Sequence, residues 1–580
     1  MNKRIMKMII LTVILLFIVP FYRASAQSSK YYNVTRLSGQ DRYETSFYIA
    51  SQVSPGVTNS IIIASGKDFP DALAGAPLSK KINAPILLLD DFIYGNSYEN
   101  LDYISKHLSQ NGTIYLLGGE SSIGSNVVNE LEQYGYKNIK RLGGMNRFDT
   151  NNIIVDEMNV EKGTPVVIVN GFNFPDALSI SSIAASKGYP IFMSEDNSIP
   201  DAVINKISSI NPSKIYLIGG SGVLSNNIQS QLKNNLSNID NENIIRISGN
   251  NRYDTSLKVA DYFKLYSKNV ILANGENFPD ALSGSALAAK LNAPIILTEG
   301  KIIDSQKSYI DSLGSSNIII LGGQGSVSED VENSFDGTKL DIGGSFNGEK
   351  IIDIKTVDIN NDGNFENIIL TNNIDNDGKV MLYVQNTSSG QIISSKIVGK
   401  SFVGYGQIIL ADITGDGLPE IISMALEGGS SGSETCDAET MDGSSLTKVD
   451  NYNDGEKPGL EVGNISEDNF SYELDGYDTF KMYSNNFNKS CSIDLANDES
   501  MQNAKVSGQE VQAWMGHGPM YSLYNIDNSG TYGLKVYEDV SGANHADSLG
   551  GFDAYYKYEN GGMKLTDLDF NSPYPMAKIK

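Results

Sequence analysis

A threefold internal repeat fills the first 335 residues and constrains the fold more than any other feature. The segment Arg36–Thr45 recurs as Arg141–Thr150 and as Arg246–Thr255, so both spacings (141 − 36 and 246 − 141) are 105 residues. Two further signatures recur in the same order: Phe-Pro-Asp-Ala-Leu, and an apolar run that ends in two glycines. A unit of this length can form a domain of its own, unlike the short units of a solenoid. The sequence therefore predicts three tandem modules with one fold.

Each repeat alternates short apolar runs with longer amphipathic stretches. In the first repeat, continuous apolar runs are typical of buried parallel strands; they lie at 61–64, 86–89 and 114–117. Helices are expected between them, near 71–81, 98–108 and 125–134. Strands that alternate with helices predict an α/β fold with a parallel sheet in each module.

Much of each signature has a structural interpretation. The aspartate of Phe-Pro-Asp is expected in the first turn of a helix, where the helix dipole favours negative charge; these residues are Asp71, Asp176 and Asp280. The residue before each phenylalanine is expected to cap that helix; these residues are Asp68, Asn173 and Asn277. The diglycines allow a tight exit from a strand, and they end at Gly119, Gly220 and Gly323.

Three arginines are not explained by helix capping. Arg42, Arg147 and Arg252 occupy a helix N-terminus, where the dipole disfavours a cation. One interpretation is an internal partner, the motif aspartate of the same repeat. The other is an anionic ligand at the C-terminal edge of the sheet, where open α/β sheets bind ligands; Lys80 and Lys81 are further candidates for such a cleft. Glycine-rich nucleotide-binding loops are absent from the sequence.

The three signatures resemble those of the cell-wall-binding repeat 2 family of clostridial surface proteins. The resemblance covers about residues 34–335, and three copies are the usual number in that family. It implies Toprim- or Rossmann-like modules in a pseudo-threefold unit, held non-covalently on an anionic secondary wall polymer of a Gram-positive bacterium. It also implies a protein of the cell wall or surface layer that displays a second, variable domain.

The N-terminus predicts export. Lys3, Arg4 and Lys7 precede an apolar run of about 13 residues and Ala24-Ser25-Ala26, which is typical of a secretory signal cleaved after Ala26. The run is short for a membrane anchor, which needs about 20 residues. After cleavage no membrane span is expected, and the sequence has no Leu-Pro-x-Thr-Gly sorting pattern. The expected order is a signal peptide (1–26), modules at 27–138, 139–243 and 244–335, and a β-rich domain at 340–580 after a linker at 335–339.

Charge is distributed unevenly. The formal charge of −25 becomes −29 once the four cations of residues 1–26 are removed; about −7 falls in residues 27–335 and about −22 in the rest. A surface this acidic excludes nucleic acid as a probable partner. It also means that a polyanion would have to bind at local basic clefts or through bridging cations.

Two acidic loops in the C-terminal part predict calcium sites. Oxygen-bearing side chains alternate around a glycine turn, as in calcium loops; the expected ligands are Asp358, Asn360, Asp362, Asn364 and Glu366 in one loop and Asp412, Thr414, Asp416 and Glu420 in the other. The loops resemble those of FG-GAP and VCBS-type repeats, which implies a β-rich, propeller-like domain that binds Ca²⁺. Asp/Asn/Gly turns without metal are the alternative.

The role of the C-terminal domain stays open between two classes. A wall-anchored domain for adhesion or surface-layer structure, with surface-layer proteins or a host ligand as partners, is the first. A wall-anchored, glycosidase-like hydrolase is the alternative, although no catalytic motif or carboxylate pair stands out. The only cysteines, Cys436 and Cys491, are either one disulfide or two thiols.

Overall fold

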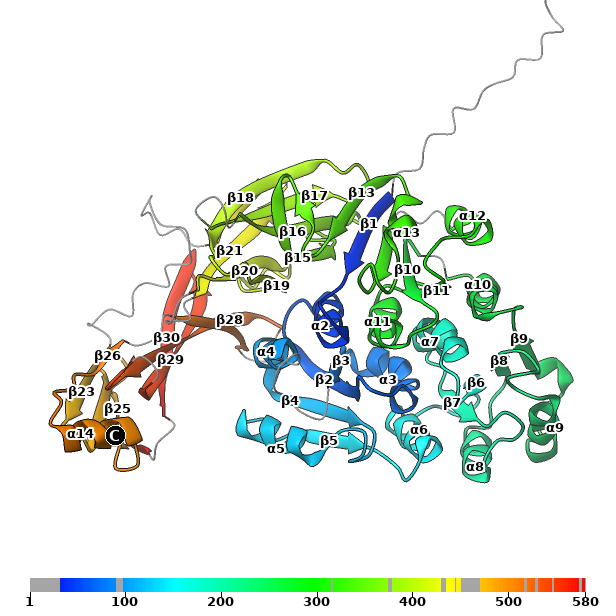
Figure 1. Ribbon diagram of the computed structural model, residues 1–580, viewed down its shortest axis with the longest axis horizontal. Helices are drawn as coiled ribbons and strands as arrows, with labels where there is room; N and C mark the ends of the chain where they lie inside the picture. Colours follow the sequence, from blue (N-terminus) through cyan, green and yellow to red (C-terminus); the bar gives the residue numbers. More distant parts are fainter. Residues whose placement is uncertain are drawn as a thin grey trace, which may run out of the picture.

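The computed structural model describes residues 32–580, except 90–97, 266, 314–316, 374–377, 429–433, 444, 450–469, 516–518, 527–529, 545–546, 573–575 and 579–580. The predicted signal peptide lies outside the described residues. Figure 1 shows the repeats as a body of helices and short strands, from which the C-terminal strands extend as an arc. Within the described residues, no helix combines the length and apolarity that a membrane crossing requires.

The first repeat forms the expected parallel sheet, in the order β3-β2-β4-β5. Its strands are β2 (Thr58–Ser65), β3 (Ile86–Leu89), β4 (Leu108–Leu117) and β5 (Ile139–Leu142). Its helices are α2 (Arg42–Val53), α3 (Gly75–Ile82), α4 (Tyr98–His107) and α5 (Ser125–Gln133), with a 3-10 turn at Pro70–Ala72. The three apolar runs and the three helices predicted from the sequence are therefore confirmed.

The second repeat has the same layout, in the order β7-β6-β8-β9. Its strands are β6 (Val166–Asn170), β7 (Ile191–Ser194), β8 (Ile215–Ile218) and β9 (Ile244–Ile247). Its helices are α6 (Arg147–Glu157), α7 (Pro175–Lys187), α8 (Asp201–Ile210) and α9 (Asn226–Asn235).

The sheet of the third repeat includes the first strand of the chain. Its sheet has the order β11-β10-β12-β1-β13, with β10 (Asn269–Asn274), β11 (Ile295–Thr298), β12 (Asn317–Leu321), β1 (Tyr32–Leu37) and β13 (Gly337–Asp341). Its helices are α10 (Arg252–Phe263), α11 (Pro279–Lys290), α12 (Asp304–Ser312) and α13 (Glu329–Asn333). Val34 of β1 pairs with Ile318 of β12 and with Lys339 of β13.

Every sheet therefore takes a strand from the start of another repeat. The strands β5 and β9 complete the sheets of the preceding repeats, and β1, from the start of the chain, completes the third. The stretch 335–339 was expected to be a linker, but that expectation was wrong. Residues from Gly337 onward form β13, because β1 offers a free edge for parallel pairing.

The three modules share one hydrophobic core. Ile62, Val167 and Ile271, one from each sheet, belong to the same buried cluster. Each sheet covers a separate outer core with its other face. Strands buried on both faces explain the continuous apolar runs in the sequence. The repeats thus form a compact pseudo-threefold unit rather than three separate beads.

The C-terminal part is mainly antiparallel β-structure in four sheets among the described residues. The first contains β14 (Ser345–Phe346), β15 (Glu349–Val357), β16 (Glu366–Asn373), β17 (Lys379–Asn386) and β18 (Ile392–Lys400). The second contains β19 (Gly406–Ala411), β20 (Glu420–Leu426), β21 (Glu434–Asp442) and β22 (Ser445–Lys448). The third contains β23 (Phe470–Asp475), β24 (Thr479–Ser484), β25 (Lys489–Asp494) and β31 (Met576–Lys578). The fourth contains β26 (Trp514–Met515), β27 (Met520–Asn525), β28 (Tyr532–Ser541), β29 (Ser548–Glu559) and β30 (Gly562–Asn571), and α14 (Glu499–Ser507) lies between the last two in sequence.

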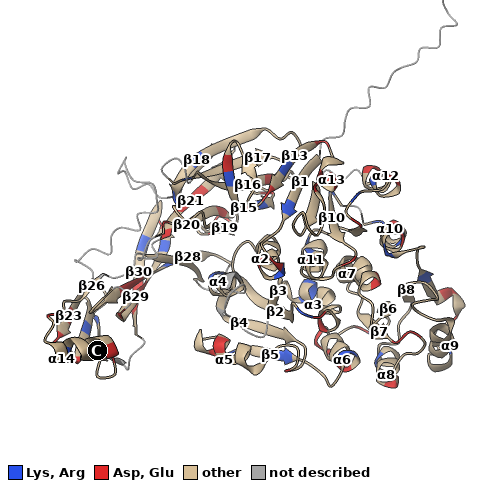
Figure 2. Cartoon of the chain, in the orientation of Figure 1, with Lys and Arg blue, Asp and Glu red and all other residues tan. Residues whose placement is uncertain are grey.

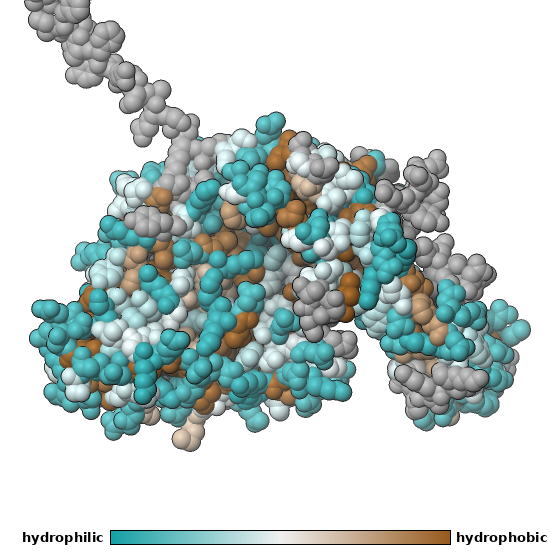
Figure 3. Space-filling model, turned by 180° about the vertical axis from the view of Figure 1, so that it is seen from behind, coloured by the Kyte–Doolittle hydropathy of each residue, from teal (hydrophilic) through white to brown (hydrophobic). Residues whose placement is uncertain are grey.

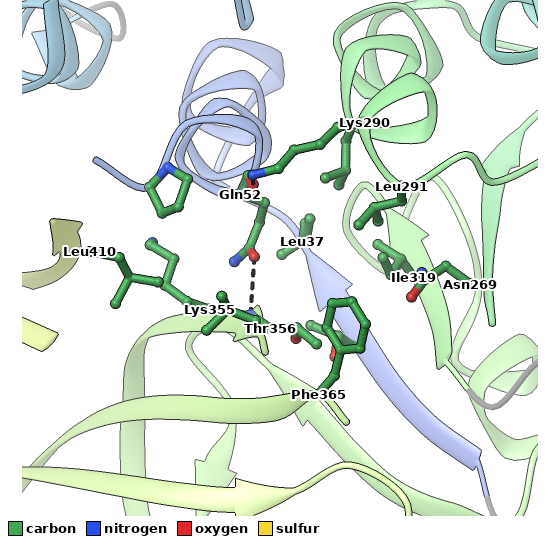
Figure 4. Close-up of a pocket in the computed structure, with 14 residues that line it drawn as sticks. Leu37, Gln52, Asn269, Lys290, Leu291, Ile319, Lys355, Thr356, Phe365 and Leu410 are labelled. Carbon is green, nitrogen blue, oxygen red and sulfur yellow. Dashed lines mark hydrogen bonds between the residues drawn. The ribbon is translucent and has the colours of Figure 1, made fainter. Parts of the chain in front are cut away.

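The C-terminal part packs directly on the repeats. Asn367 donates to Asn33 at 2.7 Å, and Lys106 and Glu434 form an ion pair at 2.9 Å with little exposure of either side chain. A cavity of about 100 Å³ lies on this seam, between β1, α2, α11 and β15 (Figure 4). There the main-chain N–H of Thr356 donates to Gln52 at 3.3 Å. The space-filling view shows a notch farther along, between the repeat body and the end of the C-terminal arc (Figure 3).

Candidate functional site

Three phenylalanines meet where the three modules converge. The ring centroids of Phe69, Phe174 and Phe278 are 5.5, 5.6 and 5.9 Å apart. Each phenylalanine directly precedes the proline that begins a 3-10 turn or helix of its module. Phe-Pro-Asp-Ala-Leu is thus the sequence that builds the pseudo-threefold axis, and these rings were not singled out from the sequence.

The helices begin differently from the expectation for this motif. Phe69, Phe174 and Phe278 occupy the cap position and no side chain caps these segments. Capping by Asp68, Asn173 and Asn277 was therefore wrong, because the turn starts one residue later, with proline supplying the preset φ of the first helical position. The motif aspartates do lie in the first turn, as predicted.

The three arginines occupy the same position in each module, and Arg42 and Arg252 lie over rings of the phenylalanine cluster. Each is the first residue of its helix, after a cap that receives main-chain N–H bonds, as Asp41 does from Tyr43 and Glu44 at 2.8 and 3.0 Å. Each guanidinium donates to the carbonyl of the glycine after a strand. The pairs are Arg42–Gly66 at 2.5 Å, Arg147–Gly171 at 2.7 Å and Arg252–Gly275 at 2.6 Å. The arginines therefore lie at the C-terminal edge of the sheets.

Arg42 and Arg252 also face the neighbouring module. The guanidinium of Arg42 lies 5.9 Å from the ring of Phe278, and its charge acts on Asp280. The guanidinium of Arg252 lies 6.0 Å from the ring of Phe174, and its charge acts on Asp176. For Arg42 and Arg252 the hypothesis of a partner aspartate in the same repeat was wrong, since the modules pack around an axis that brings adjacent repeats together.

The aspartates lie against the diglycines. The serine hydroxyls of Ser122 and Ser326 donate to Asp71 and Asp280 at 2.6 and 2.9 Å. A Cβ on the first glycine of each pair would fall within 2.2–2.6 Å of an aspartate oxygen; these glycines are Gly118, Gly219 and Gly322, and their φ angles are positive. The second glycines, Gly119, Gly220 and Gly323, instead accept main-chain bonds in the following turn.

Burial dominates the electrostatics of two aspartates. Burial raises the pKa of Asp176 to about 6, and the positive charge of Arg252 opposes that rise. Burial also raises the pKa of Asp280, against the hydrogen bond from Ser326 and the charge of Arg42. The position of Ser122 and Ser326 is Val223 in the second repeat, so Asp176 lacks that hydroxyl donor.

The structure separates the candidate lysines from the arginines. Lys80 and Lys81 are exposed at the C-terminal end of α3, whereas the phenylalanines and arginines lie at the other end of this helix layer. Lys81 donates to the carbonyl of Met158 at the end of α6, which suits the negative end of that helix dipole. The five cations therefore do not line one cleft. In Figure 2, cations and acids are interspersed over the repeats rather than gathered on separate sides.

The two predicted calcium loops share one conformation. Asp358 accepts from the N–H groups of Asp362 and Gly363 at 2.9 Å each. Asp412 accepts from Gly415 and Gly417 at 2.6 and 2.9 Å. The turn glycines Gly363 and Gly417 have φ of 86° and 88°. Each loop thus folds around its first aspartate.

A buried glutamate closes the base of each loop. Glu366 accepts from the N–H of Ile359 at 3.3 Å, and Glu420 from that of Ile413 at 2.8 Å. Burial raises the pKa of Glu366 to about 7 and raises that of Glu420. The described residues contain no group of three or more Cys, His, Asp or Glu side chains able to hold a metal by themselves. A calcium ion here would therefore also need amide, hydroxyl or main-chain oxygens.

The donor set of the first loop fits calcium. The side-chain oxygens of Asp358 and Asn360 both accept from the N–H of Asp362, at 2.9 and 3.1 Å, so they converge on one side of the turn. Asn364 donates its N–H to Asp362 at 2.8 Å. Carboxylate and amide oxygens around a sharp glycine turn are what a hard cation prefers.

The C-terminal part also holds buried acids that the sequence did not reveal. Asp498, Asp539 and Asp547 are 1, 3 and 6% exposed. Burial, together with a hydrogen bond to Asp498, raises the pKa of Asp547 to about 6. Asp539 and Asp547 are 8 residues apart (547 − 539) and Asp498 lies 41 residues earlier (539 − 498), and the three share no motif, so no signal in the chain groups them.

The structure does not contain the disulfide that the sequence left open. Cys436 and Cys491 are both free and buried. They lie on β21 and β25, strands of two different sheets, and burial raises the pKa of both thiols.

Comparisons with known proteins agree with the threefold architecture. The family model described as cell wall binding domain 2 matches residues 36–128, 141–229 and 246–332. The model described as YybI C-terminal domain matches residues 468–571. That match covers the last two sheets except β31. The resemblance of the acidic loops to FG-GAP and VCBS-type repeats stays a prediction.

Two curated relatives come from Bacillus subtilis. The N-acetylmuramoyl-L-alanine amidase LytC is 32% identical over 52% of this chain and 58% of its own length. The amidase enhancer is 31% identical over 54% of this chain and 41% of its own length. The chain thus spans about half the length of the curated relatives it matches.

Two solved structures from Clostridium difficile are also similar. Cwp6 is 26% identical, with a TM-score of 0.47 over 53% of this chain and 48% of that one. Cwp8 is 27% identical, with a TM-score of 0.45 over 52% of this chain and 51% of that one. Three segments of the chain thus match cell wall binding domain 2 and a later segment matches the YybI C-terminal domain, and the chain is a protein of the cell wall or cell surface.

Proposed function

We propose that the pseudo-threefold unit anchors this protein non-covalently to an anionic secondary wall polymer, through the face that carries Arg42, Arg147 and Arg252. The observation that carries the proposal is the repetition of one arrangement three times. A guanidinium stands at each sheet's C-terminal edge, anchored by a glycine carbonyl. Arginine suits the planar anionic groups of such a polymer.

Three repeated arginine positions allow a unit with a negative net charge to bind a polyanion. The repeats carry about −7, so their overall field does not attract a polyanion. Local guanidinium groups act over a few ångströms, while more distant charges are screened over about 8–10 Å at physiological salt. Three weak contacts with one long polymer then reinforce one another through effective concentration.

The test is binding of the mature chain to purified walls before and after acid extraction of the secondary polymer. We expect the mature chain to bind walls that still carry the secondary polymer and not walls from which it has been extracted. We also expect weaker binding when Arg42→Lys, Arg147→Lys and Arg252→Lys are combined. Lysine keeps the charge but loses the fork of donors. Undiminished binding of the triple variant would remove the arginine face from the proposal.

We further propose that the C-terminal part is displayed on the wall for adhesion or for surface-layer structure, with surface-layer proteins or a host ligand as partners. Its rigid attachment supports this. Lys355 is 2% exposed in its ion pair with Asp353 and donates to Ser51 of α2 at 3.1 Å. A domain fixed in this way keeps a set orientation relative to the wall.

A wall-anchored hydrolase is the second candidate. It is supported by the amidase among the relatives, which is similar over 52% of this chain, and by the buried carboxylates Asp498, Asp539 and Asp547. The pKa of Asp547, which burial raises to about 6, suits a general acid in such an enzyme. Incubation of the chain with purified walls, followed by assay for released amino groups and reducing sugar, separates the two. Release that Asp547→Asn abolishes would favour the hydrolase.

We also propose that the two loops bind Ca²⁺ through Asp358, Asn360, Asp362, Asn364 and Glu366, and through Asp412, Thr414, Asp416 and Glu420. The converging oxygens of the first loop support this. Bound calcium would neutralise acids in a region with a charge of about −22 and would stabilise β15–β16 and β19–β20 connections.

A further inference from the structure

The three arginine positions are built alike but are surrounded by different side chains. Each arginine donates to the carbonyl of the glycine that follows a strand, and the residue after that glycine differs between the modules. That residue is Lys67 in the first repeat, Phe172 in the second and Glu276 in the third, and all three are exposed. One position of the repeat is therefore basic, aromatic or acidic depending on the module.

In the third repeat the arginine is neutralised internally. The carboxylate of Glu276 lies 3.2 Å from the guanidinium of Arg252 and also accepts the hydroxyl of Tyr253. The side chains of Arg252 and Glu276 are 35% and 55% exposed, so this ion pair remains open to solvent and salt. An anion that approaches Arg252 has to compete with a carboxylate that is already in place.

In the second repeat the arginine is stacked. The guanidinium of Arg147 lies 4.6 Å from the ring centroid of Phe172, and Phe148 packs against the same ring at 5.9 Å. Among the described residues no carboxylate forms an ion pair with Arg147. The stack covers one face of the guanidinium and leaves its edge donors able to bind an anion.

One exposed apolar side chain, Phe172, contacts this arginine, and another, Met145, stands two residues before it in the chain. Phe172 is 51% exposed and Met145 is 97% exposed. The positions equivalent to Met145 are Gln40 and Asn250, so this position is apolar in the second repeat and polar in the other two. Exposed apolar groups beside an unneutralised cation are typical of a recognition surface. A sugar ring with an attached anionic group fits this combination, because the ring has an apolar face for Phe172 and the anion reaches Arg147.

We propose that the three positions are unequal: the second repeat is the principal subsite, which takes a sugar ring together with its anionic substituent, and the third is restrained by its own Glu276. This inference rests on the proposed anchoring to an anionic wall polymer and assigns the order of its subsites. The polymer would then be bound with a preferred register rather than equally by three repeats.

Two variants and a matched control test the order of the subsites in the full mature chain. Glu276→Gln removes the competing carboxylate, and we expect about threefold tighter binding to purified walls at low salt, with a steeper loss as salt rises. Phe172→Ala removes the stacking ring, and we expect about fivefold weaker binding. Glu242→Gln makes the same change in net charge on an exposed residue of another segment, and its binding should match the wild type.

The outcomes separate this inference from the proposed function. If Glu276→Gln binds no better than Glu242→Gln, or Phe172→Ala binds like the wild type, the unequal subsites are refuted while wall anchoring stands. If the wild type does not distinguish intact walls from acid-extracted walls, the proposed function fails and the inference fails with it. Thermal melting of each variant shows that binding changes do not come from unfolding, because both side chains are exposed.

Discussion

Replacing Asp176 by asparagine should stabilise the repeat unit at neutral pH. The side chain is 8% exposed and touches Gly219, and no serine hydroxyl stands where Ser122 and Ser326 serve the other repeats. The pKa of Asp176 is about 6 in the folded chain, against 3.8 as the ordinary value. The folded state therefore prefers the neutral carboxyl group, and asparagine imitates it.

The magnitude follows from linkage. A rise in pKa from 3.8 to about 6 corresponds to about 3 kcal/mol, at about 1.4 kcal/mol per pH unit. Because the folded pKa is raised, the wild type gains stability as the pH falls through 6 and loses it as the pH rises. The advantage of the variant is then largest above pH 7. It should shrink by about 1.4 kcal/mol between pH 7.5 and pH 5.

Urea unfolding followed by circular dichroism at both pH values measures this difference. Val223→Ser is the matched control, since it restores the hydroxyl donor of the other two repeats and should lower the pKa of Asp176. In that background the pH dependence of Asp176→Asn should be smaller. Parallel pH profiles for wild type and Asp176→Asn would refute the assignment of the raised pKa to burial at this site.

Three further predictions concern other parts of the chain. Deleting residues 32–37 should lower the melting temperature by more than about 10 °C, because β12 and β13 lose the strand between them. Asp362→Ala with Asp416→Ala should abolish any rise in melting temperature caused by calcium; an unchanged rise would place the ion elsewhere. Cys436 and Cys491 should react with a thiol reagent only after denaturation, and fast labelling of the native chain would contradict their burial.

The module fold was predictable because the same three signatures recur in each of the three repeats. Constant spacing defined the units, and the continuous apolar runs at 86–89 and 114–117 became strands as expected. The cap before Arg42 also follows from the local sequence, since Asp41 and Glu44 stand at capping-box spacing. These features depend on local chemistry, which a sequence shows directly.

The exchange of strands between modules was not predictable. Spacing shows that a strand exists at 139–142, but it does not show whether that strand joins the sheet before it or after it. The interpretation that placed a partner aspartate of Arg42 in the same repeat was wrong for the same reason. The strand β13 was missed because Gly337-Thr338-Lys339 is polar, and its pairing depends on β1, about 300 residues away.

Wall binding by the repeat unit alone tests the central claim most directly. The fragment should span residues 27–341, because it must keep both β1 and β13 in the third sheet. Pull-down on purified walls, before and after acid extraction, should show binding by this fragment to intact walls only, and no binding by residues 342–580. Binding by the C-terminal fragment, or equal binding of the repeat unit to extracted walls, would contradict anchoring by the three repeats to the secondary polymer.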